Sequence, residues 1–346
     1  MSRGNPQIWA LVGGRQGDNN QVLALAEELG LQFEVKPLRY ARIGGYDLGR
    51  VKPRRLGASL LSLDRMSKVL IKPPWPDLVI GVGRRSVPVA RFIRKMSGGR
   101  TKLVRIGNPR VDPRLFDLVI TTPQYSVPAA ENVLTLPVAM SRFRGPAQIG
   151  PDEKSWLDQW RRPHLLLALG GNTKDVELQP NEVVAATNRL GARAKSRRGT
   201  LLIVGSPRTD PALLQAIAPD GIFVPTGGPS FAALLDDADE IFVTGDSISM
   251  LSEAIVTGKP VGMIPARLTE TGLRGVGEAH RGPLDFRSPQ RDPRKFWAQL
   301  QELGLVGTVD EPRSSHTVNP VQLAAEAVRK LLGDAREDVA TAISIN

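Results

Sequence analysis

The sequence predicts an α/β protein built from two Rossmann-like domains that face a cleft. Short apolar runs alternate with amphipathic helical patterns along nearly the whole chain, glycine turns follow several of these runs, and the pattern breaks off and restarts once. Such alternation is typical of parallel sheets covered by helices. The 346 residues also exceed the usual size of one domain.

The first half contains the expected strands of one sheet. They are residues 8–12, 33–38, 77–82, 102–106, 117–121 and 132–136. A glycine turn follows the first strand, and the apolar spacing of residues 19–30 then predicts an amphipathic helix that Gly30 ends.

A domain boundary is expected within residues 141–163, where the strand pattern gives way to Pro, Gly and charge. We therefore expect one domain over residues 1–145 and a second over 146–346. The strands expected in the second domain are residues 164–171, 200–206, 221–228, 240–245 and 260–265. Two helical patterns, 293–304 and 319–333, are expected to end this domain.

Composition indicates an ordinary folded protein, with 41% hydrophobic and 23% charged residues. The absence of cysteine excludes disulfides, thiolate metal sites and cysteine nucleophiles, and it suits a reducing compartment. No apolar run reaches the roughly 18–20 residues that span a bilayer, and the amino terminus lacks the apolar core of a secretion signal. We expect a cytoplasmic protein.

Positive charge is concentrated in the first half. Residues 1–150 hold 24 Lys and Arg against 10 Asp and Glu, a balance of +14, whereas the remainder holds 22 against 25, a balance of −3. This asymmetry favours an anionic partner for the first half, and the alternative is a solubility feature.

Three turns of the second domain carry residues that suit a phosphate or sugar ligand. They are Leu169-Gly170-Gly171-Asn172-Thr173 after the first strand, Pro225-Thr226-Gly227-Gly228 after the third, and Thr244-Gly245-Asp246-Ser247 after the fourth. Ligands of parallel sheets bind beyond the carboxyl ends of the strands, where helix N-termini present free N–H groups. Each turn alone is also ordinary turn and capping chemistry. Three of them in one domain are expected to converge on one ligand.

Ser249 and Glu253 stand four residues apart in the helical pattern after the fourth strand, so they share a face. A carboxylate on that face would accept two hydrogen bonds from a ribose diol, while serine hydroxyls and N–H groups take phosphates. The alternative for Glu253 is a favourable partner of the helix dipole.

Several other site types are absent from the sequence. The first turn, GGRQGD, lacks the G-x-G-x-x-G spacing of dinucleotide sites and the Lys-Ser/Thr of a P-loop. The three histidines are far apart and show no zinc-like spacing, so we expect no metal. Asp236, Asp237 and Asp239 are interpreted as solvated loop acids.

The stretch VTGDSISMLSEAIVTGKPV, with GGRQGDNNQ near the start and SPRT at 206–209, resembles the family named for the plant elongated-mitochondria fission factor. That family looks like a divergent glycosyltransferase of the two-domain B type. Its second domain is similar to that of the bacterial enzyme that adds N-acetylglucosamine to lipid-linked peptidoglycan precursors.

The resemblance implies that the second domain binds a nucleotide-sugar co-substrate and the first an acceptor, with no other cofactor. By position, Glu253 would hold the ribose and Ser247 and Ser249 the diphosphate. Val224 and Pro225 would contact the base, and Gly170, Gly171 and Asn172 would border the donor phosphates. Arg208 would neutralise the leaving diphosphate without a metal; its alternative is a surface cation that caps a helix.

Asp18 is the candidate catalytic base, because it lies on the turn after the first strand of the acceptor domain. Its alternative role is the N-cap of a helix that begins at Asn19. Glu278 and His280 are weaker candidates for the base. The turn that carries Asp18 supplies Gly13, Gly14 and Gly17 as an acceptor loop.

Residues 50–72 form a basic amphipathic pattern. Its leucines fall near helical spacing, and it carries the cations Arg54, Arg55, Arg65, Lys68 and Lys72. Such a helix suits an anionic bilayer surface, and the alternative is a helix that packs on its own sheet. Nucleic acid, with Arg84 and Arg85 as phosphate contacts, is the rival partner. It is disfavoured because aromatic side chains that stack on bases are scarce.

Two functions follow. The first is an inverting, metal-independent glycosyltransferase that acts on a lipid-linked or envelope glycan at the inner membrane surface, where the protein would be peripheral. The second is a non-catalytic, membrane-associated scaffold factor of the mitochondrial-fission type. They differ in nucleotide binding through Glu253, which only the first requires.

Overall fold

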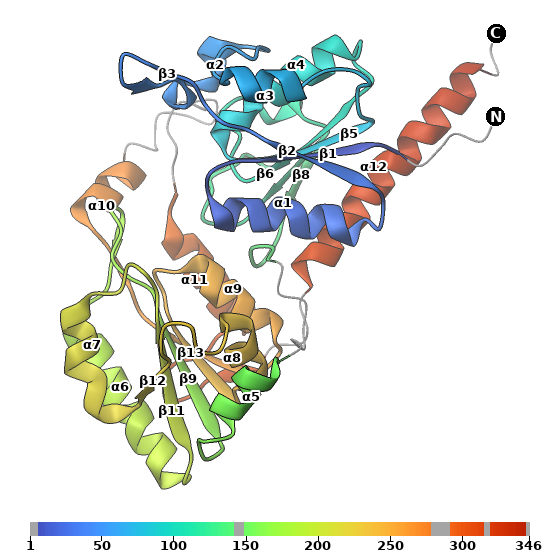
Figure 1. Ribbon diagram of the computed structural model, residues 1–346. Coiled ribbons are helices and arrows are strands. Elements are labelled where there is room, and N and C mark those ends of the chain that lie inside the picture. Colours follow the sequence, from blue (N-terminus) through green and yellow to red (C-terminus); the bar gives the residue numbers. More distant parts are fainter. Residues whose placement is uncertain (1–5, 142–148, 278–290, 315–318, 344–346) are drawn as a thin grey trace. The chain divides into compact units, whose positions relative to one another are not determined.

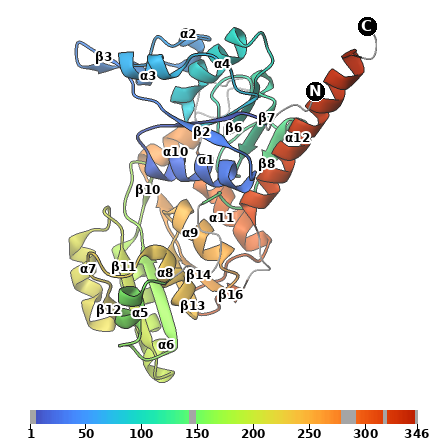
Figure 2. The same cartoon turned by 45° about the vertical axis from the view of Figure 1, so that its right-hand side comes forward.

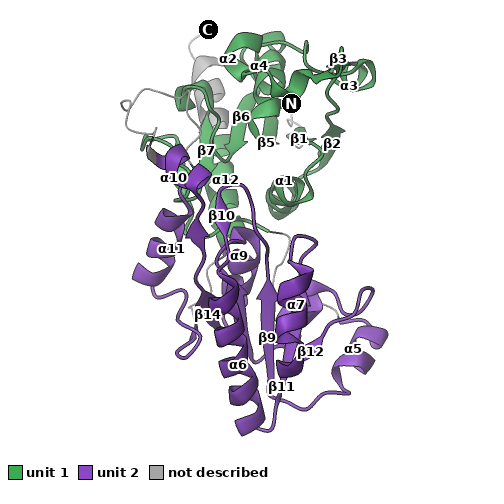
Figure 3. Cartoon of the chain, turned by 90° about the vertical axis from the view of Figure 1, so that its left-hand side faces the viewer, with its two compact units in different colours: residues 1–142, 279–291, 320–346 green, residues 143–278, 292–319 purple. Residues whose placement is uncertain are grey.

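The computed structural model describes residues 6–141, 149–277, 291–314 and 319–343, and the chain forms two compact α/β units (Figure 1). Unit 1 comprises residues 1–142, 279–291 and 320–346, and unit 2 comprises residues 143–278 and 292–319 (Figure 3). Both are Rossmann-like, so the prediction of an α/β protein with two Rossmann-like domains is confirmed.

Unit 1 is built on a six-stranded, wholly parallel sheet. In spatial order its strands are β2 (Phe33–Pro37), β1 (Ile8–Val12), β5 (Leu78–Val82), β6 (Lys102–Ile106), β7 (Leu118–Thr121) and β8 (Val133–Thr135). The side chains of successive residues in each strand point to opposite faces of the sheet. Ile8 and Ala10 lie in one apolar cluster, and Trp9 and Leu11 lie in another.

Helices cover both faces of this sheet. Helix α1 (Gln16–Glu28) and helix α12 (Pro320–Ile343) pack on the face that contains Ile8 and Ala10. Helix α4 (Val87–Met96) packs on the opposite face. Both views in Figure 1 and Figure 2 show α12 running beside α1.

Helix α12 belongs to unit 1, although the sequence pattern placed it at the end of the second domain. Val321, Ala324, Ala325 and Val328 are at most 3% exposed and share a core cluster with α1. The cause is the apolar face of this helix, which fills the sheet face beside α1. The domain prediction of 146–346 is corrected accordingly.

Unit 2 is built on a second six-stranded sheet, parallel except at its last strand. In spatial order its strands are β12 (Ile222–Phe223), β11 (Thr200–Gly205), β9 (His164–Leu169), β13 (Glu240–Thr244), β14 (Pro260–Ile264) and β16 (Arg313–Ser314). The helices around it are α5 (Pro151–Leu157), α6 (Pro180–Ser196), α7 (Pro211–Ile217), α8 (Phe231–Asp237), α9 (Ile248–Val256), α10 (Glu270–Gly277) and α11 (Pro293–Glu302).

Residues 50–72 do not form the single amphipathic helix that the leucine spacing predicts. They contain two short helices, α2 (Pro53–Leu56) and α3 (Arg65–Leu70), separated at Gly57, which has a positive φ of 59°. Leu63 is fully buried in the core of unit 1. The remaining short elements are the hairpin β3 (Arg42–Ile43) with β4 (Tyr46–Asp47), the antiparallel pair β10 (Val176–Glu177) with β15 (Arg267–Leu268), and the 3₁₀ turns 48–50, 84–86, 113–115 and 218–220.

The strand orders fix where each unit can bind a ligand. In unit 2, β11 lies on one side of β9 and β13 lies on the other, so the strand order reverses between β9 and β13. In unit 1, β2 lies on one side of β1 and β5 lies on the other, so the order reverses between β1 and β5. Loops diverge at such switch points and leave room for a ligand beyond the carboxyl ends of the strands. Among the described helices, none combines the length and the apolar character needed to cross a bilayer.

Candidate functional site

The switch point of unit 2 lies between the turns that follow β9 and β13. The Gly170-Gly171 turn and the Asp246 turn meet there, because Gly171 N–H donates a 2.8 Å hydrogen bond to Asp246 Oδ2. Gly170 N–H donates to Thr244 Oγ1 at 2.8 Å. Two of the three turns singled out in the sequence are therefore brought together at one edge of the sheet.

The two glycines are required by packing inside unit 2. A Cβ at Gly170 would collide with the Asp246 carboxylate, and one at Gly171 would collide with the backbone carbonyl of Arg208. The two glycines therefore allow neighbouring turns of unit 2 to approach each other, and their position beside the donor phosphates stays a prediction.

Asp246 is an internal anchor of this edge. Its side chain is fully buried, and its Oδ2 lies 3.6 Å from Arg208 Nη2. Its Oδ1 is among the buried atoms without a hydrogen-bond partner in the described part of the chain. Burial raises the pKa of this carboxyl, and the bond from Gly171 and the charge of Arg208 oppose the rise. Asp246 holds Gly171 and Arg208 in place through Oδ2, and its direct contact with a nucleotide stays a prediction.

Arg208 joins the site from the turn after β11. Its Nη1 donates to the Gly171 carbonyl at 3.0 Å, and its side chain remains 45% exposed. The guanidinium therefore retains N–H groups for an anion. The alternative of a helix-capping surface cation does not describe these contacts.

Two threonines hold the turns in place and were not identified from the sequence as site residues. Thr209 Oγ1 accepts from Ser206 N–H at 2.8 Å and donates to the Leu169 carbonyl at 3.1 Å. Thr244 accepts the Gly170 N–H. Ser or Thr at a strand end is the only sequence signal for such contacts, and it is a weak one.

Helix α9 begins directly after this edge. Ser247 occupies its N-cap position, but its side chain makes no capping bond, so it leaves the first-turn N–H groups uncapped. Ser247 is 9% exposed, whereas Ser249 is exposed. Trp297 of α11 donates from Nε1 to the Gly245 carbonyl at 2.8 Å, a contact that no spacing in the sequence predicts.

Glu253 lies within α9, on the same face as Ser249, as the four-residue spacing predicts. Its side chain is partly buried, and it makes no hydrogen bond or ion pair to a described residue. Burial alone raises the pKa of this carboxyl to about 7. A buried carboxyl with no partner is costly for the fold and is typical of binding and catalytic sites.

The remaining predicted nucleotide contacts lie at the margin of this edge. Asn172 is exposed, and its Oδ1 accepts from Leu178 N–H at 2.8 Å, which leaves its amide N–H groups free to donate. Val224 and Pro225 follow the edge strand β12, three strands from β13. At about 4.8 Å per strand, this separation is roughly 14 Å, comparable to the length of an extended nucleotide.

In unit 1, Asp18 lies inside the first turn of α1, which begins at Gln16. The proposed alternative, an N-cap of a helix starting at Asn19, is wrong because Arg15 occupies the N-cap position. Asn19 instead closes the preceding turn, since its amide accepts from Gly13 N–H and donates to Gly13 C=O, both at 2.8 Å. Asp18 is partly exposed, and its Oδ2 lies near Gly83 at the end of β5.

The acceptor-loop glycines differ from those of unit 2. A Cβ added at any of them would meet nothing within 4 Å, and none has a positive φ. They are Gly13, Gly14 and Gly17. Neither packing nor backbone conformation within the described chain requires glycine at these positions. The two other candidates for the base, Glu278 and His280, lie outside the described residues.

The acids at the end of α8 have structural partners. Asp237 binds Arg162 and His164, and Asp239 accepts from His164 N–H at 2.7 Å. Asp237 and Asp239 therefore hold the segment that enters β9, and for these two acids the interpretation as solvated loop acids is corrected. Among the described residues, no cluster of three His, Asp or Glu could hold a metal.

Comparison with known proteins gives relatives of the whole chain. The model of the family described as Mitochondrial fission ELM1 matches residues 16–333, which span both units. The uncharacterized protein RP120 of Rickettsia prowazekii (strain Madrid E) is 22% identical over 302 residues, covering 73% of this chain and 82% of that protein.

Solved structures with similarity over most of the chain include two proteins. The UDP-GlcNAc 2-epimerase from Methanocaldococcus jannaschii is 11% identical with a TM-score of 0.48, covering 94% of this chain and 99% of that chain. MurG from Acinetobacter baumannii is 14% identical with a TM-score of 0.43, covering 94% and 91%.

Proposed function

The chain belongs to the Mitochondrial fission ELM1 family, and we propose that this member is a glycosyltransferase that uses a nucleotide sugar. In this proposal unit 2 binds the nucleotide and unit 1 binds the acceptor. The observation that carries it is Glu253, a partly buried carboxyl without a partner among the described residues, on α9 directly after the switch point.

The ribose is the part of the nucleotide that Glu253 suits. An ionised carboxylate accepts two hydrogen bonds, and a cis-diol donates two from adjacent hydroxyls. Such a bond pair would also offset the cost of burying this carboxyl. The i,i+4 relation to Ser249 then directs the ribose-linked phosphates towards the N-terminus of α9.

The diphosphate would meet three kinds of donor at that end of α9. The uncapped first-turn N–H groups, the exposed Ser249 hydroxyl and the free N–H groups of Arg208 all favour an anion. Asp246 contributes by holding Arg208 and Gly171 in place. Val224 and Pro225 would border the base.

The proposed reaction is a direct displacement. The acceptor hydroxyl oxygen forms a bond to the anomeric carbon, and the bond from that carbon to the diphosphate oxygen breaks with its electron pair. The hydroxyl proton passes to Asp18, and Arg208 with the α9 N–H groups stabilises the departing nucleoside diphosphate. Attack from the side opposite the leaving group inverts the anomeric centre.

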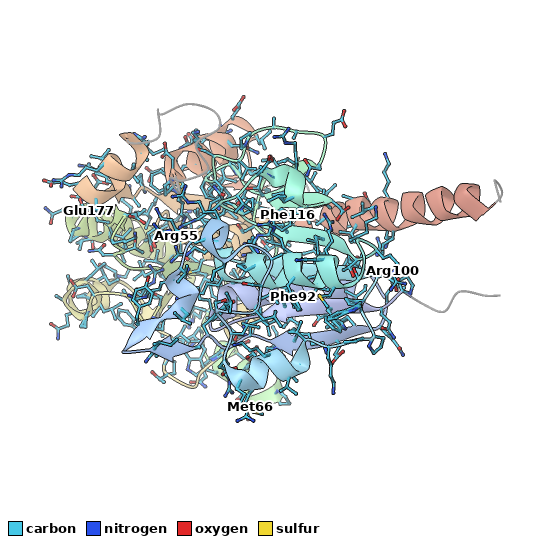
Figure 4. All side chains as sticks on the ribbon, turned by 90° about the horizontal axis from the view of Figure 1, so that it is seen from above. Arg55, Met66, Phe92, Arg100, Phe116 and Glu177 are labelled. Atoms are coloured by element: carbon cyan, nitrogen blue, oxygen red, sulfur yellow. The ribbon has the colours of Figure 1, made fainter. Side chains whose placement is uncertain are left out.

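The proposed acceptor is a lipid-linked or envelope glycan, because unit 1 carries a surface that suits an anionic bilayer. Among the residues whose exposure the structure describes, seven of the eleven exposed large hydrophobic side chains lie within residues 35–70. On α3, Met66 and Val69 are 72% and 58% exposed, and Figure 4 shows Met66 pointing outward. All five predicted membrane cations, Arg54, Arg55, Arg65, Lys68 and Lys72, are exposed.

This basic apolar surface consists of those five cations with Leu61, Met66, Val69 and Leu70. It differs from the predicted leucine face, because Leu63 is in the core and other apolar side chains are exposed. Apolar insertion and cationic attraction act together on such a surface.

Calorimetric titration with UDP, GDP, ADP and CMP tests the proposal. We expect one nucleotide to bind, and Glu253→Ala to weaken its binding at least about tenfold, the loss expected when hydrogen bonds to a charged group disappear. Glu302→Ala, an exposed glutamate of α11, is the matched control and should bind normally.

Binding of no nucleotide, or binding that Glu253→Ala leaves unchanged, would contradict the transferase proposal. That outcome would favour the non-catalytic scaffold, which needs the basic apolar surface but no nucleotide.

A further inference from the structure

Arg105 is a buried guanidinium on a central strand of unit 1. It is 2% exposed, and the strand register places it opposite Gly81 on β5. Its Nη1 donates a 2.9 Å hydrogen bond to Ser86 Oγ, in the turn that follows β5. A Cβ at Gly81 would lie 3.2 Å from that same oxygen, so glycine there makes room for the contact.

The remaining donors of Arg105 are not satisfied. Its Nε and Nη2 are buried and have no hydrogen-bond partner within the described chain. Burial lowers the pKa of Arg105 to about 10, so the side chain stays charged at neutral pH. An unpaired buried cation is strongly unfavourable and calls for a compensating anion.

The turns around Arg105 belong to the switch point of unit 1. The turn after β1 leads into α1, whose N-cap residue Arg15 makes no side-chain capping bond. In the same turn, the space beside Gly13, Gly14 and Gly17 is open. Free helix N–H groups at a switch point favour a bound anion.

More positive charge gathers at the same turns. Burial, together with the charges of Arg84 and Arg15, lowers the pKa of Arg110, which follows β6. Arg110 therefore lies within electrostatic reach of Arg15, Arg84 and Arg105. Asp18 is the carboxylate that acts on Arg105, so positive charge is in excess at these turns. Arg85 is not part of this excess, because it pairs with Asp47 at 3.0 Å.

We propose that this edge of unit 1 is an oxyanion site, formed by the α1 N-terminus, Arg84 and Arg110 above the buried Arg105, and that it holds a phosphoryl group. The charge of Arg105 acts on the anion through the low-dielectric interior, which makes one buried cation more effective than an exposed one. Ser86 and Gly81 keep this cation in position.

As an acceptor site, this inference rests on the proposed function. It then states the class of acceptor: a molecule that carries a phosphoryl group close to the hydroxyl that reacts. The phosphoryl group fixes the acceptor beside Asp18, the proposed proton acceptor. The anion binding itself does not depend on a donor nucleotide.

Titration of the full-length protein with inorganic phosphate and with short-chain phosphatidic acid, using short-chain phosphatidylcholine as the neutral comparison, tests the site. We expect Arg105→Lys to weaken phosphate binding at least about tenfold, since a buried lysine readily loses its proton, and with it the charge that acts on the anion, whereas the guanidinium stays charged. Arg110→Asn removes a second charge and keeps the left-handed backbone, with φ of 56°, that Asn tolerates. It keeps the test valid should Arg105→Lys fail to fold.

Two control variants separate this site from other arginines. Arg100→Gln removes an exposed arginine that precedes β6, at the opposite end of that strand (Figure 4), and should bind phosphate normally. Arg208→Gln removes the cation of unit 2, so the phosphate binding that remains in this variant belongs to unit 1 and should be lost when Arg105→Lys is added. Loss of binding in Arg208→Gln, with normal binding in Arg105→Lys and Arg110→Asn, would overturn the inference.

The two ligands distinguish the source of the phosphoryl group. Tighter binding of phosphatidic acid than of phosphate, lost in the same variants, identifies a lipid headgroup, and equal binding identifies a soluble phosphate compound. Arg105-dependent phosphate binding without any nucleotide binding would support this site and contradict the proposed function. Glu253-dependent nucleotide binding with no phosphate binding outside unit 2 would support the proposed function and contradict this site.

Discussion

Glu253 and Asp246 are both buried acids of unit 2, yet their surroundings differ. Asp246 has the Gly171 N–H and Arg208 as partners, whereas Glu253 has no partner among the described residues. Asp246 therefore acts on the site through other residues. Glu253 has no partner for either carboxylate oxygen among the described residues, so both oxygens can accept hydrogen bonds from a ligand.

Replacing Glu253 should stabilise the fold at high pH. The pKa of this carboxyl is about 7 in the folded protein against 4.5 for an unperturbed glutamate. The folded state holds the proton more tightly, so the free energy of unfolding falls as the pH rises from 4.5 to 7. Glu253→Gln removes this loss, which is about 3 kcal/mol at most and smaller with solvent screening.

Urea unfolding at pH 5 and at pH 8 measures this difference. Glu253→Gln should match the wild type closely at pH 5 and exceed it at pH 8, while nucleotide binding is weakened at both. If the difference in free energy of unfolding between Glu253→Gln and the wild type is the same at pH 5 and pH 8, the pKa of the Glu253 carboxyl is not raised.

At the scale of elements, the glycine turns of the two units should respond oppositely to alanine. Gly171→Ala places a methyl group against the Arg208 backbone and should cost about 1–3 kcal/mol of stability. Gly14→Ala meets nothing within 4 Å, so it should be neutral or stabilise by up to about 1 kcal/mol. Thermal unfolding of the two variants checks this, and a destabilised Gly14→Ala would contradict the open geometry of that turn.

Helix α12 supplies a second matched pair. Val328 is fully buried against unit 1, and Leu323 on the same helix is 45% exposed. Val328→Asp would bury an unpaired charge and should cost more than about 3 kcal/mol, whereas Leu323→Asp should change the stability by less than about 0.5 kcal/mol. Chemical denaturation distinguishes them, and similar values would mean that α12 is not part of the core.

At the scale of the whole molecule, the basic apolar surface predicts binding to anionic vesicles. Binding should weaken as salt screens the cations, since each contributes about 1 kcal/mol near the bilayer. A Met66→Ser, Val69→Ser double variant should reduce binding, and Met96→Ser, an exposed methionine of α4, should not. Vesicle co-sedimentation measures this. Equal binding to neutral and anionic vesicles would contradict a contribution of the cations to membrane binding.

The core strands were predictable from the sequence because their apolar runs are continuous and end in glycine or polar turns. The first strand, 8–12, and the run at 102–106 were located to the residue. Residues 50–72 were not, because leucine spacing alone does not show that Gly57 breaks the helix or that Leu63 turns inward. The membership of α12 in unit 1 was also not predictable, since an amphipathic pattern does not show which of the two sheets the helix packs on.

The candidate sites were predictable only in part. Strand-end turns and helical spacing placed Glu253 and Ser249 on the correct helix, whereas Asp18 was expected on the preceding turn and lies inside the first turn of α1. The reason for Gly170 and Gly171 lies in contacts with residues far along the chain, which spacing cannot reveal. Arg105 was missed because an arginine inside an apolar run gives no signal of its burial until the neighbouring strands are known.

The position of α12 has a consequence for how the protein is made. Unit 1 begins with the first strand, yet its core includes Val321 and Val328, which leave the ribosome after all of unit 2. At roughly 5–20 residues per second, the first half waits for tens of seconds with the face of α1 uncovered. Unit 2, although it is synthesised later, can therefore complete its fold first, whereas the core of unit 1 stays incomplete until α12 has been synthesised.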